Sequence, residues 1–315
     1  MLQARRQTPL DASHARTVLS LDADASRPSS PIAPMKRGLL LLAVARAAIV
    51  EIPWPKPSTS PLNISMGYAT VVSTGTRFNW YSATLDDVSR FSVQLPSAGC
   101  AVLQPTTATA RAKGCAVGSN AGFFQFSPKP TYCLGEVVVD GTIIEWADDG
   151  SPLVAVTRNS TIIGPLVRDD IARLGVVYAT SGFGVIVENG APSPAGVERA
   201  RAAIRALRPT AEEVAPRTIF AVDRAGRIAI VAIDGVEKLN LGITLTEAAA
   251  IFSGGATGFP GDFMHAVNMD GGGSTTFSSS PLWPLPAQVF NRPTDTDFGP
   301  ISERAVTNIF CIKGQ

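Results

Sequence analysis

The chain has 315 residues, 45% of them hydrophobic, and a formal net charge of +1, so it can form one large domain or two small ones with a sizeable core. The near-neutral charge and the 7% aromatic content argue against a basic, base-stacking surface, and we expect no nucleic-acid partner. The only histidines are His14 and His265, which argues against a centre of several imidazoles, so we expect no metal and no other cofactor.

The first 54 residues are expected to form a disordered leader with a signal-like segment. Residues 1–34 are rich in Ser, Pro, Ala, Asp and Arg and show no sustained hydrophobic period. The stretch MKRGLLLLAVARAAIV then combines two basic residues, a short apolar run and an A-x-A site, as a signal peptide does, with translation starting at Met1 or Met35. A buried terminal strand or helix is the alternative. The run is too short to span a bilayer, and we expect no transmembrane anchor in this chain.

Residues 55–315 are expected to form a single catalytic domain. Short apolar runs punctuated by Gly, Pro and Asp predict strands, with a tight turn at Asp140-Gly141. Helices are expected over 196–209, where Pro209 ends the pattern, and over 244–255, where Thr244 and Glu247 form a capping box. The pattern predicts a strand-rich α+β fold with mixed or mainly antiparallel sheets and a few helices.

The chain has four cysteines, at positions 100, 115, 133 and 311, without the spacing of metal ligands. An even count of this kind favours two disulfides in an exported protein, and it leaves three pairings open. Four buried thiols in a cytosolic protein are the alternative.

The stretch NMDGGGSTTF, residues 268–277, predicts an anion-binding loop. A short strand ends at Asp270, and three glycines then form a tight turn whose backbone N–H groups can converge on an anion as a nest. Ser274 and Thr275 add hydroxyl donors, and Asp270 brings a carboxylate to the rim. These residues predict a site for a phosphate ester beside a carboxylate. A flexible glycine turn is the alternative.

A second candidate segment, residues 115–141, contains the sequence SNAGFF. An apolar run brings Asn120 to a glycine turn, and Phe123 and Phe124 follow. An asparagine amide suits a sugar hydroxyl, and the two phenylalanines could wall the apolar face of a sugar. An ordinary turn in the core is the alternative.

Five motifs in order resemble the phosphodiester glycosidase family: NAGFF, CLGEVVVDG, RT before a hairpin that ends in DG, NMDGGGSTTF, and RAVTNIFC. The resemblance covers about residues 95–313. It implies a hydrolase that cleaves the bond between the anomeric carbon of N-acetylglucosamine, or a related sugar, and a phosphodiester. The products would be the free sugar and a phosphomonoester such as mannose 6-phosphate, on a glycan that a glycoprotein can carry.

The resemblance also implies roles for individual residues. Asp270 would be the catalytic carboxylate. Glu303 is a candidate second one because it stands beside Arg304, and not because the family pattern has an acid there. Arg217 and Arg304 match arginines of the family motifs, and a guanidinium offers two parallel donors to phosphate oxygens. The other residues expected to bind substrate are Asn120, Phe123, Phe124, Gly271, Gly272, Gly273, Ser274 and Thr275. Asp223 and Asp234 also match family acids, but both end hairpin strands, where turn formation is the simpler explanation.

The implied disulfides are Cys100–Cys133 and Cys115–Cys311, which suit a protein that is secreted or located in the lumen of the secretory pathway. Two other functions are open to such a sequence. One is a carbohydrate-binding domain that does not catalyse a reaction, and the other is a metal-assisted phosphodiesterase.

Overall fold

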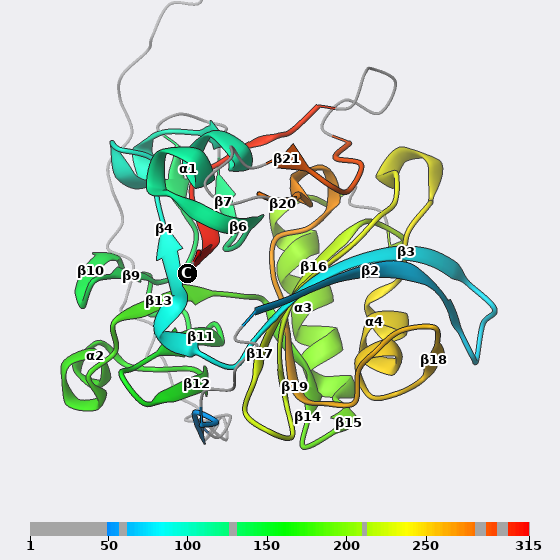
Figure 1. Cartoon of the computed structure of the whole chain (residues 1–315), viewed down its shortest axis with the longest axis horizontal. Coiled ribbons are helices and arrows are strands. Elements are labelled where there is room, and N and C mark those ends of the chain that lie inside the picture. Colours follow the sequence, from blue (N-terminus) through cyan, green and yellow to red (C-terminus); the bar gives the residue numbers. More distant parts are fainter. Residues whose placement is uncertain are drawn as a thin grey trace, which may run out of the picture. The chain divides into compact units, whose positions relative to one another are not determined.

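Antiparallel sheets dominate this computed structural model (Figure 1), which describes residues 49–56, 62–125, 131–209, 213–280, 288–294 and 302–314. The described residues all belong to one compact unit, Ala45–Gln315. The signal-like segment lies almost entirely outside the described residues. Residues 50–53, which we had included in the leader, form an edge strand of a sheet instead.

The central sheet has eight strands, and its middle strands are buried on both faces. Its order is β15 (Ala191–Pro192), β14 (Gly184–Glu188), β19 (Phe263–Asn268), β16 (Arg217–Asp223), β17 (Ile228–Ile233), β3 (Arg77–Leu85), β2 (Leu62–Val71) and β18 (Ala256–Thr257). All six residues of β17 are buried, which explains its continuous apolar sequence IAIVAI.

Two further sheets and two small ribbons complete the strands that the structure describes. The six-stranded sheet has the order β1 (Val50–Pro53), β12 (Ser160–Gly164), β11 (Leu153–Val156), β13 (Tyr178–Ser181), β9 (Val137–Val139) and β10 (Thr142–Glu145). The five-stranded sheet has the order β21 (Gln288–Val289), β20 (Phe277–Ser279), β6 (Cys115–Asn120), β23 (Ile309–Lys313) and β4 (Phe91–Gln94). The ribbons pair β22 (Ala305–Val306) with β5 (Gln104–Pro105), and β7 (Phe124–Gln125) with β8 (Tyr132–Cys133).

Four α-helices lie in the described part of the chain: α1 (Thr106–Lys113), α2 (Arg168–Leu174), α3 (Pro194–Leu207) and α4 (Leu245–Phe252). Helices α3 and α4 pack on one face of the central sheet (Figure 1), around buried residues such as Ile219 and Val231. The capping box of Thr244 and Glu247 is present at the start of α4, as predicted. The strand-rich α+β fold is thus confirmed, whereas α1 and α2 were not predicted.

The opposite face of the central sheet packs against the other two large sheets. Phe220 of β16 lies 5.7 Å from Phe91 of β4 and 5.6 Å from Phe310 of β23, measured between ring centroids. These rings belong to a buried cluster that all three sheets share. Burial of one large aromatic side chain contributes about 1.5–3 kcal/mol, so this cluster holds β6 and β23 firmly against the strands that lead to the site described below.

Two disulfides connect the segments around this core. Cys100 is bonded to Cys133, and Cys115 of β6 is bonded to Cys311 of the neighbouring strand β23. These are the two pairs that the family resemblance implied. None of the described helices has the length and apolar character required to cross a membrane.

Candidate active site

The loop after β19 is anchored from three directions. The backbone N–H of Met269 donates to Thr218 O, and that of Asp270 donates to Ala121 O, both at 3.0 Å. The amide of Asn120 then joins the strands: its Nδ2 donates to Asp270 O at 2.6 Å, and its Oδ1 accepts from Thr218 Oγ1 and from the N–H of Thr276. The backbone that carries Asp270 is therefore held at a fixed position between β6 and β16.

These hydrogen bonds correct the role that we expected for Asn120. We expected its amide to contact a sugar, but the side chain is completely buried and its amide oxygen and nitrogen are bonded within the protein. Asn120 positions Asp270. Thr275 is likewise buried and does not line the cavity, although we expected it to bind substrate.

Each of the three glycines lies against a different neighbour. A Cβ atom on Gly271 would lie 2.8 Å from Pro216 O, which is backbone and cannot move easily. Gly272 has a φ of +60°, which favours glycine, and a Cβ there would lie 2.7 Å from Glu237 Oε2. A Cβ on Gly273 would collide with the guanidinium of Arg304. Crowding by Pro216, Glu237 and Arg304, with the positive φ at Gly272, explains the three glycines.

The predicted nest of converging amides is not what the loop forms. Its N–H groups at Gly272, Ser274 and Thr275 donate to carbonyl oxygens of Pro216, Gly271 and Gly272, at 2.9–3.2 Å. Residues Gly272–Ser274 are consequently a short 3-10 turn. Those three amides are occupied, so the contribution of the loop is to let charged side chains approach Asp270 closely.

A cavity of about 460 Å³ opens beside this loop. The predicted residues that line it are Phe123, Phe124, Arg217, Asp270, Gly271, Gly272, Ser274 and Arg304. Residues that the sequence analysis missed also line it: Gln125, Ile204, Ala206, Leu207, Arg208, Ala215, Glu237 and Met269. The cavity thus brings together the two segments that the motifs indicated, and it adds the end of α3.

Asp270 is the carboxylate at the centre of this cavity. Its Oδ2 is buried and has no hydrogen-bond partner among the described residues. Burial raises the pKa of Asp270 to about 6, although the Ser274 hydroxyl and the charge of Arg304 act in the opposite direction. A carboxyl group with a pKa near neutrality can gain or lose a proton during a reaction.

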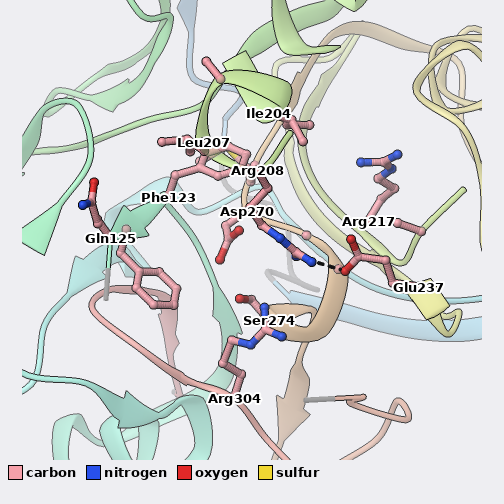
Figure 2. Close-up of a pocket in the computed structure, with 16 residues that line it drawn as sticks. Phe123, Gln125, Ile204, Leu207, Arg208, Arg217, Glu237, Asp270, Ser274 and Arg304 are labelled. Atoms are coloured by element: carbon pink, nitrogen blue, oxygen red, sulfur yellow. Dashed lines mark hydrogen bonds and ion pairs between the residues drawn. The ribbon is translucent and has the colours of Figure 1, made fainter. Parts of the chain in front are cut away.

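Two guanidinium groups flank Asp270. Figure 2 shows its carboxylate facing Ser274 and Arg304, with the side chain of Arg208 beside it and reaching toward Glu237. Arg208 follows the last residue of α3, and its Nη1 lies 3.2 Å from Oε2 of Glu237. The positive charges of Arg304 and Arg208 both favour the ionised form of Asp270, yet burial outweighs them in setting its pKa.

Arg217 lines the cavity, but its guanidinium points away from Asp270 (Figure 2). Its Nε donates to Ile243 O at 3.3 Å, and its Nη2 donates to Glu213 O at 2.7 Å. Burial lowers the pKa of Arg217 to about 10. We expected Arg217 to bind phosphate, but its Nε and Nη2 donors are already bonded to backbone carbonyl oxygens.

Glu303 lies outside the cavity, which corrects its expected catalytic role. Its carboxylate accepts from the N–H of Thr107 at 2.9 Å and from Thr107 Oγ1 at 2.5 Å, in the first turn of α1. An acid at this end of a helix satisfies amide donors and interacts favourably with the helix dipole. Asp223 and Asp234 are also outside the cavity and accept backbone N–H groups of nearby residues.

The other wall of the cavity is apolar. Phe123 stacks on Phe183 with ring centroids 3.6 Å apart and an angle of 11° between the rings. Phe124, Ile204 and Leu207 extend this wall. An apolar surface opposite charged groups can hold a molecule with one apolar face and one anionic group.

The fold and the cavity define an antiparallel α+β domain with a buried carboxylate between arginines. The family model for phosphodiester glycosidases matches residues 113–313. The chain belongs to the phosphodiester glycosidase family.

Among curated proteins, the chain is similar to N-acetylglucosamine-1-phosphodiester alpha-N-acetylglucosaminidase. The Bos taurus protein is 29% identical over 199 residues, which cover 59% of this chain and 36% of the relative. The Homo sapiens protein is 27% identical over 239 residues, which cover 71% of this chain and 45% of the relative. The chain spans less than half of the length of these relatives.

Solved structures support the fold. The catalytic domain of the zebrafish N-acetylglucosamine-1-phosphodiester alpha-N-acetylglucosaminidase, auto-inhibited by its pro-peptide, superimposes with a TM-score of 0.71 at 20% identity, covering 85% of this chain and 89% of that one. A hypothetical protein from Synechocystis gives a TM-score of 0.53 at 16% identity, covering 85% of this chain and 64% of that one. At sequence identities this low, the structural similarity shows that the fold is shared and nothing more.

Proposed function

We propose that the protein is a hydrolase that cleaves the bond between the anomeric carbon of N-acetylglucosamine, or a closely related sugar, and a phosphodiester. The observation that carries this proposal is the carboxylate of Asp270, held between the guanidinium groups of Arg208 and Arg304 in a cavity with one apolar wall. Family membership and the names of the similar curated proteins support it.

The chemistry suits these residues. The bond between C1 of the sugar and the phosphate oxygen breaks, and the electron pair leaves with a phosphomonoester whose second pKa is only about 6. Such a leaving group needs little help from a general acid, in contrast to the alcohol released by an ordinary glycosidase. Fixed positive charge lowers the barrier by stabilising the negative charge that develops on the phosphate, and Arg304 lies where it can supply that charge.

Asp270 is the proposed catalytic carboxylate. Ionised, it stabilises positive charge at the anomeric carbon and accepts a proton from the water that attacks this carbon. The water oxygen becomes the new C1 hydroxyl, and the proton returns to solvent. The apolar wall with Phe123 and Leu207 would contact the sugar ring and its acetamido methyl group.

The finer identity of the substrate is part of the same proposal. By analogy with the activity for which its relatives are named, the sugar would be N-acetylglucosamine in α linkage, and the product could be mannose 6-phosphate on a glycoprotein glycan. The two disulfides support a secreted protein or one in the lumen of the secretory pathway.

The test is release of free N-acetylglucosamine from UDP-N-acetylglucosamine or from N-acetylglucosamine-phospho-methylmannoside, with and without EDTA. Product that EDTA does not reduce, and that disappears in Asp270→Asn, would support the proposal. Binding without product would favour a non-catalytic carbohydrate-binding domain. Activity that EDTA abolishes would favour a metal-assisted phosphodiesterase.

A further inference from the structure

The residue that follows α3 places a positive charge in the cavity. Arg208 follows Leu207, the last helical residue, and its side chain remains 52% exposed. The Arg208 end of its ion pair with Glu237 is therefore in contact with solvent, which limits what the pair contributes to stability. The contact with Glu237 matters more for where it places the Arg208 guanidinium than for the stability of the protein.

Glu237 is far more buried than its partner. Its side chain is only 10% exposed, and its Oε2 lies where a side chain on Gly272 would be, at 2.7 Å from the position of a Cβ atom. The buried charge of Arg217 also attracts it. The carboxylate of Glu237 is thus a largely buried partner that sets the position of the more exposed side chain of Arg208.

The donors of Arg208 are only partly used. The ion pair with Glu237 engages Nη1, and a guanidinium has five N–H donors in a planar fork. Arg217 cannot bind an anion in place of Arg208, because its Nε and Nη2 donate to backbone carbonyl oxygens. Arg304 approaches Asp270 from the other side, over Gly273. Both arginines line the cavity and both act electrostatically on Asp270, so an anion bound there would lie in the field of both charges.

We infer that Arg208 is a second phosphate-binding residue of this site and determines its specificity for a phosphoryl leaving group, with Glu237 as the positioning residue. The assignment rests on the proposed function for the reaction, but phosphate binding can be measured without turnover. It places the sugar beside the apolar wall and the phosphoryl group between Arg208 and Arg304. A glycoside with a neutral leaving group would not use Arg208.

The experiment measures binding of inorganic phosphate and of N-acetylglucosamine by calorimetry to the full chain and its variants. Arg208→Ala should weaken phosphate binding about 10- to 100-fold, as expected for loss of a charged hydrogen-bond partner, and leave sugar binding unchanged. Arg208→Lys should recover part of the affinity, because it keeps the charge and loses the fork. Glu237→Gln should give an intermediate loss, since Arg208 remains but is no longer held.

Arg205→Ala is the matched control. Arg205 lies on the same helix, its side chain is 62% exposed, and it does not line the cavity. Its replacement removes the same charge and should leave phosphate affinity within about 2-fold of the original, as expected for a solvated surface charge. Melting temperature checks that each variant is folded.

The outcomes separate this inference from the proposed function. If the unchanged protein binds no phosphate, or if Arg208→Ala binds it as tightly as the unchanged protein, the inference is overturned even where diester hydrolysis is observed. If Arg208→Ala and Arg205→Ala weaken binding equally, only a long-range charge effect is present and the inference also fails. A selective loss in Arg208→Ala supports it, even in a protein that releases no sugar.

Discussion

Replacing Asp270 by asparagine should remove activity and make the folded protein more stable at neutral pH. Burial raises the pKa of this carboxyl from 3.8 to about 6 in the folded protein. Each pH unit between two such pKa values corresponds to about 1.36 kcal/mol, so an ionised Asp270 destabilises the folded state by up to about 3 kcal/mol. The value is an upper limit, because the side chain is not fully buried and solvent screens its charge.

The sign of this effect depends on pH. Below about pH 4 the carboxyl is protonated in both the folded and the unfolded chain, and the asparagine gives no advantage. As the pH rises from 3.8 to 6, the unfolded chain loses this proton before the folded protein does, so the wild-type protein becomes progressively less stable relative to the variant. Above about pH 6 the difference reaches its full size, equivalent to roughly 6–12 °C in melting temperature.

Thermal and urea denaturation at pH 4, 5.5 and 7.5 would measure this effect. Asp262→Asn serves as the control, because Asp262 is 59% exposed and paired with Arg224 at the surface, where a substitution changes stability by about 0.5 kcal/mol or less. An Asp270→Asn variant that is less stable than the wild type at pH 7.5, or whose advantage does not grow with pH, would refute the assigned environment of this carboxylate. If the Asp270→Asn variant retained turnover, Asp270 would have no catalytic role.

Three other outcomes are expected. The rate kcat should fall below about pH 6, because Asp270 must be ionised to accept a proton from water, and a pH–rate profile without this acidic limb would contradict that role. Gly273→Ala should lower kcat/KM at least about 10-fold with little change in melting temperature, since its Cβ displaces the flexible Arg304 side chain. Glu303→Gln should keep kcat within about 2-fold while lowering stability by about 1 kcal/mol, as expected for a helix cap; a large loss of kcat would restore its catalytic role.

Local sequence signals predicted the parts of the fold that local interactions determine. The apolar runs mark strands because β17 is buried along its whole length and β16 at every residue but the last. The capping box at Thr244 marked the start of α4 because both partners lie within one turn. In contrast, α1 has the sequence TTATARAK, without an apolar stripe, and its first turn is bonded to Glu303, 196 residues away. No local pattern could indicate such a contact.

The residues of the candidate site likewise fall into those that a local motif revealed and those that no local motif could reveal. Asp270 and its glycines could be found because the motif is continuous, and Phe123 because it lies in a second motif. Arg208 and Glu237 were missed because each stands alone, one after a helix and one in a short 3-10 turn. The sequence LRP at the end of a predicted helix was the available signal, but a basic residue there is also what the helix dipole favours.

The predicted roles failed where a side chain was assumed to face the substrate rather than the protein. Asn120 makes three hydrogen bonds to the strands and the loop around Asp270. At about 1 kcal/mol net for each bond, they contribute approximately what the ionised carboxylate costs, about 3 kcal/mol at neutral pH. An ionised group in a partly dry site relaxes by moving toward water unless its backbone is fixed. Asn120 therefore acts on the reaction through Asp270, by keeping the carboxylate where burial can hold its pKa near neutrality.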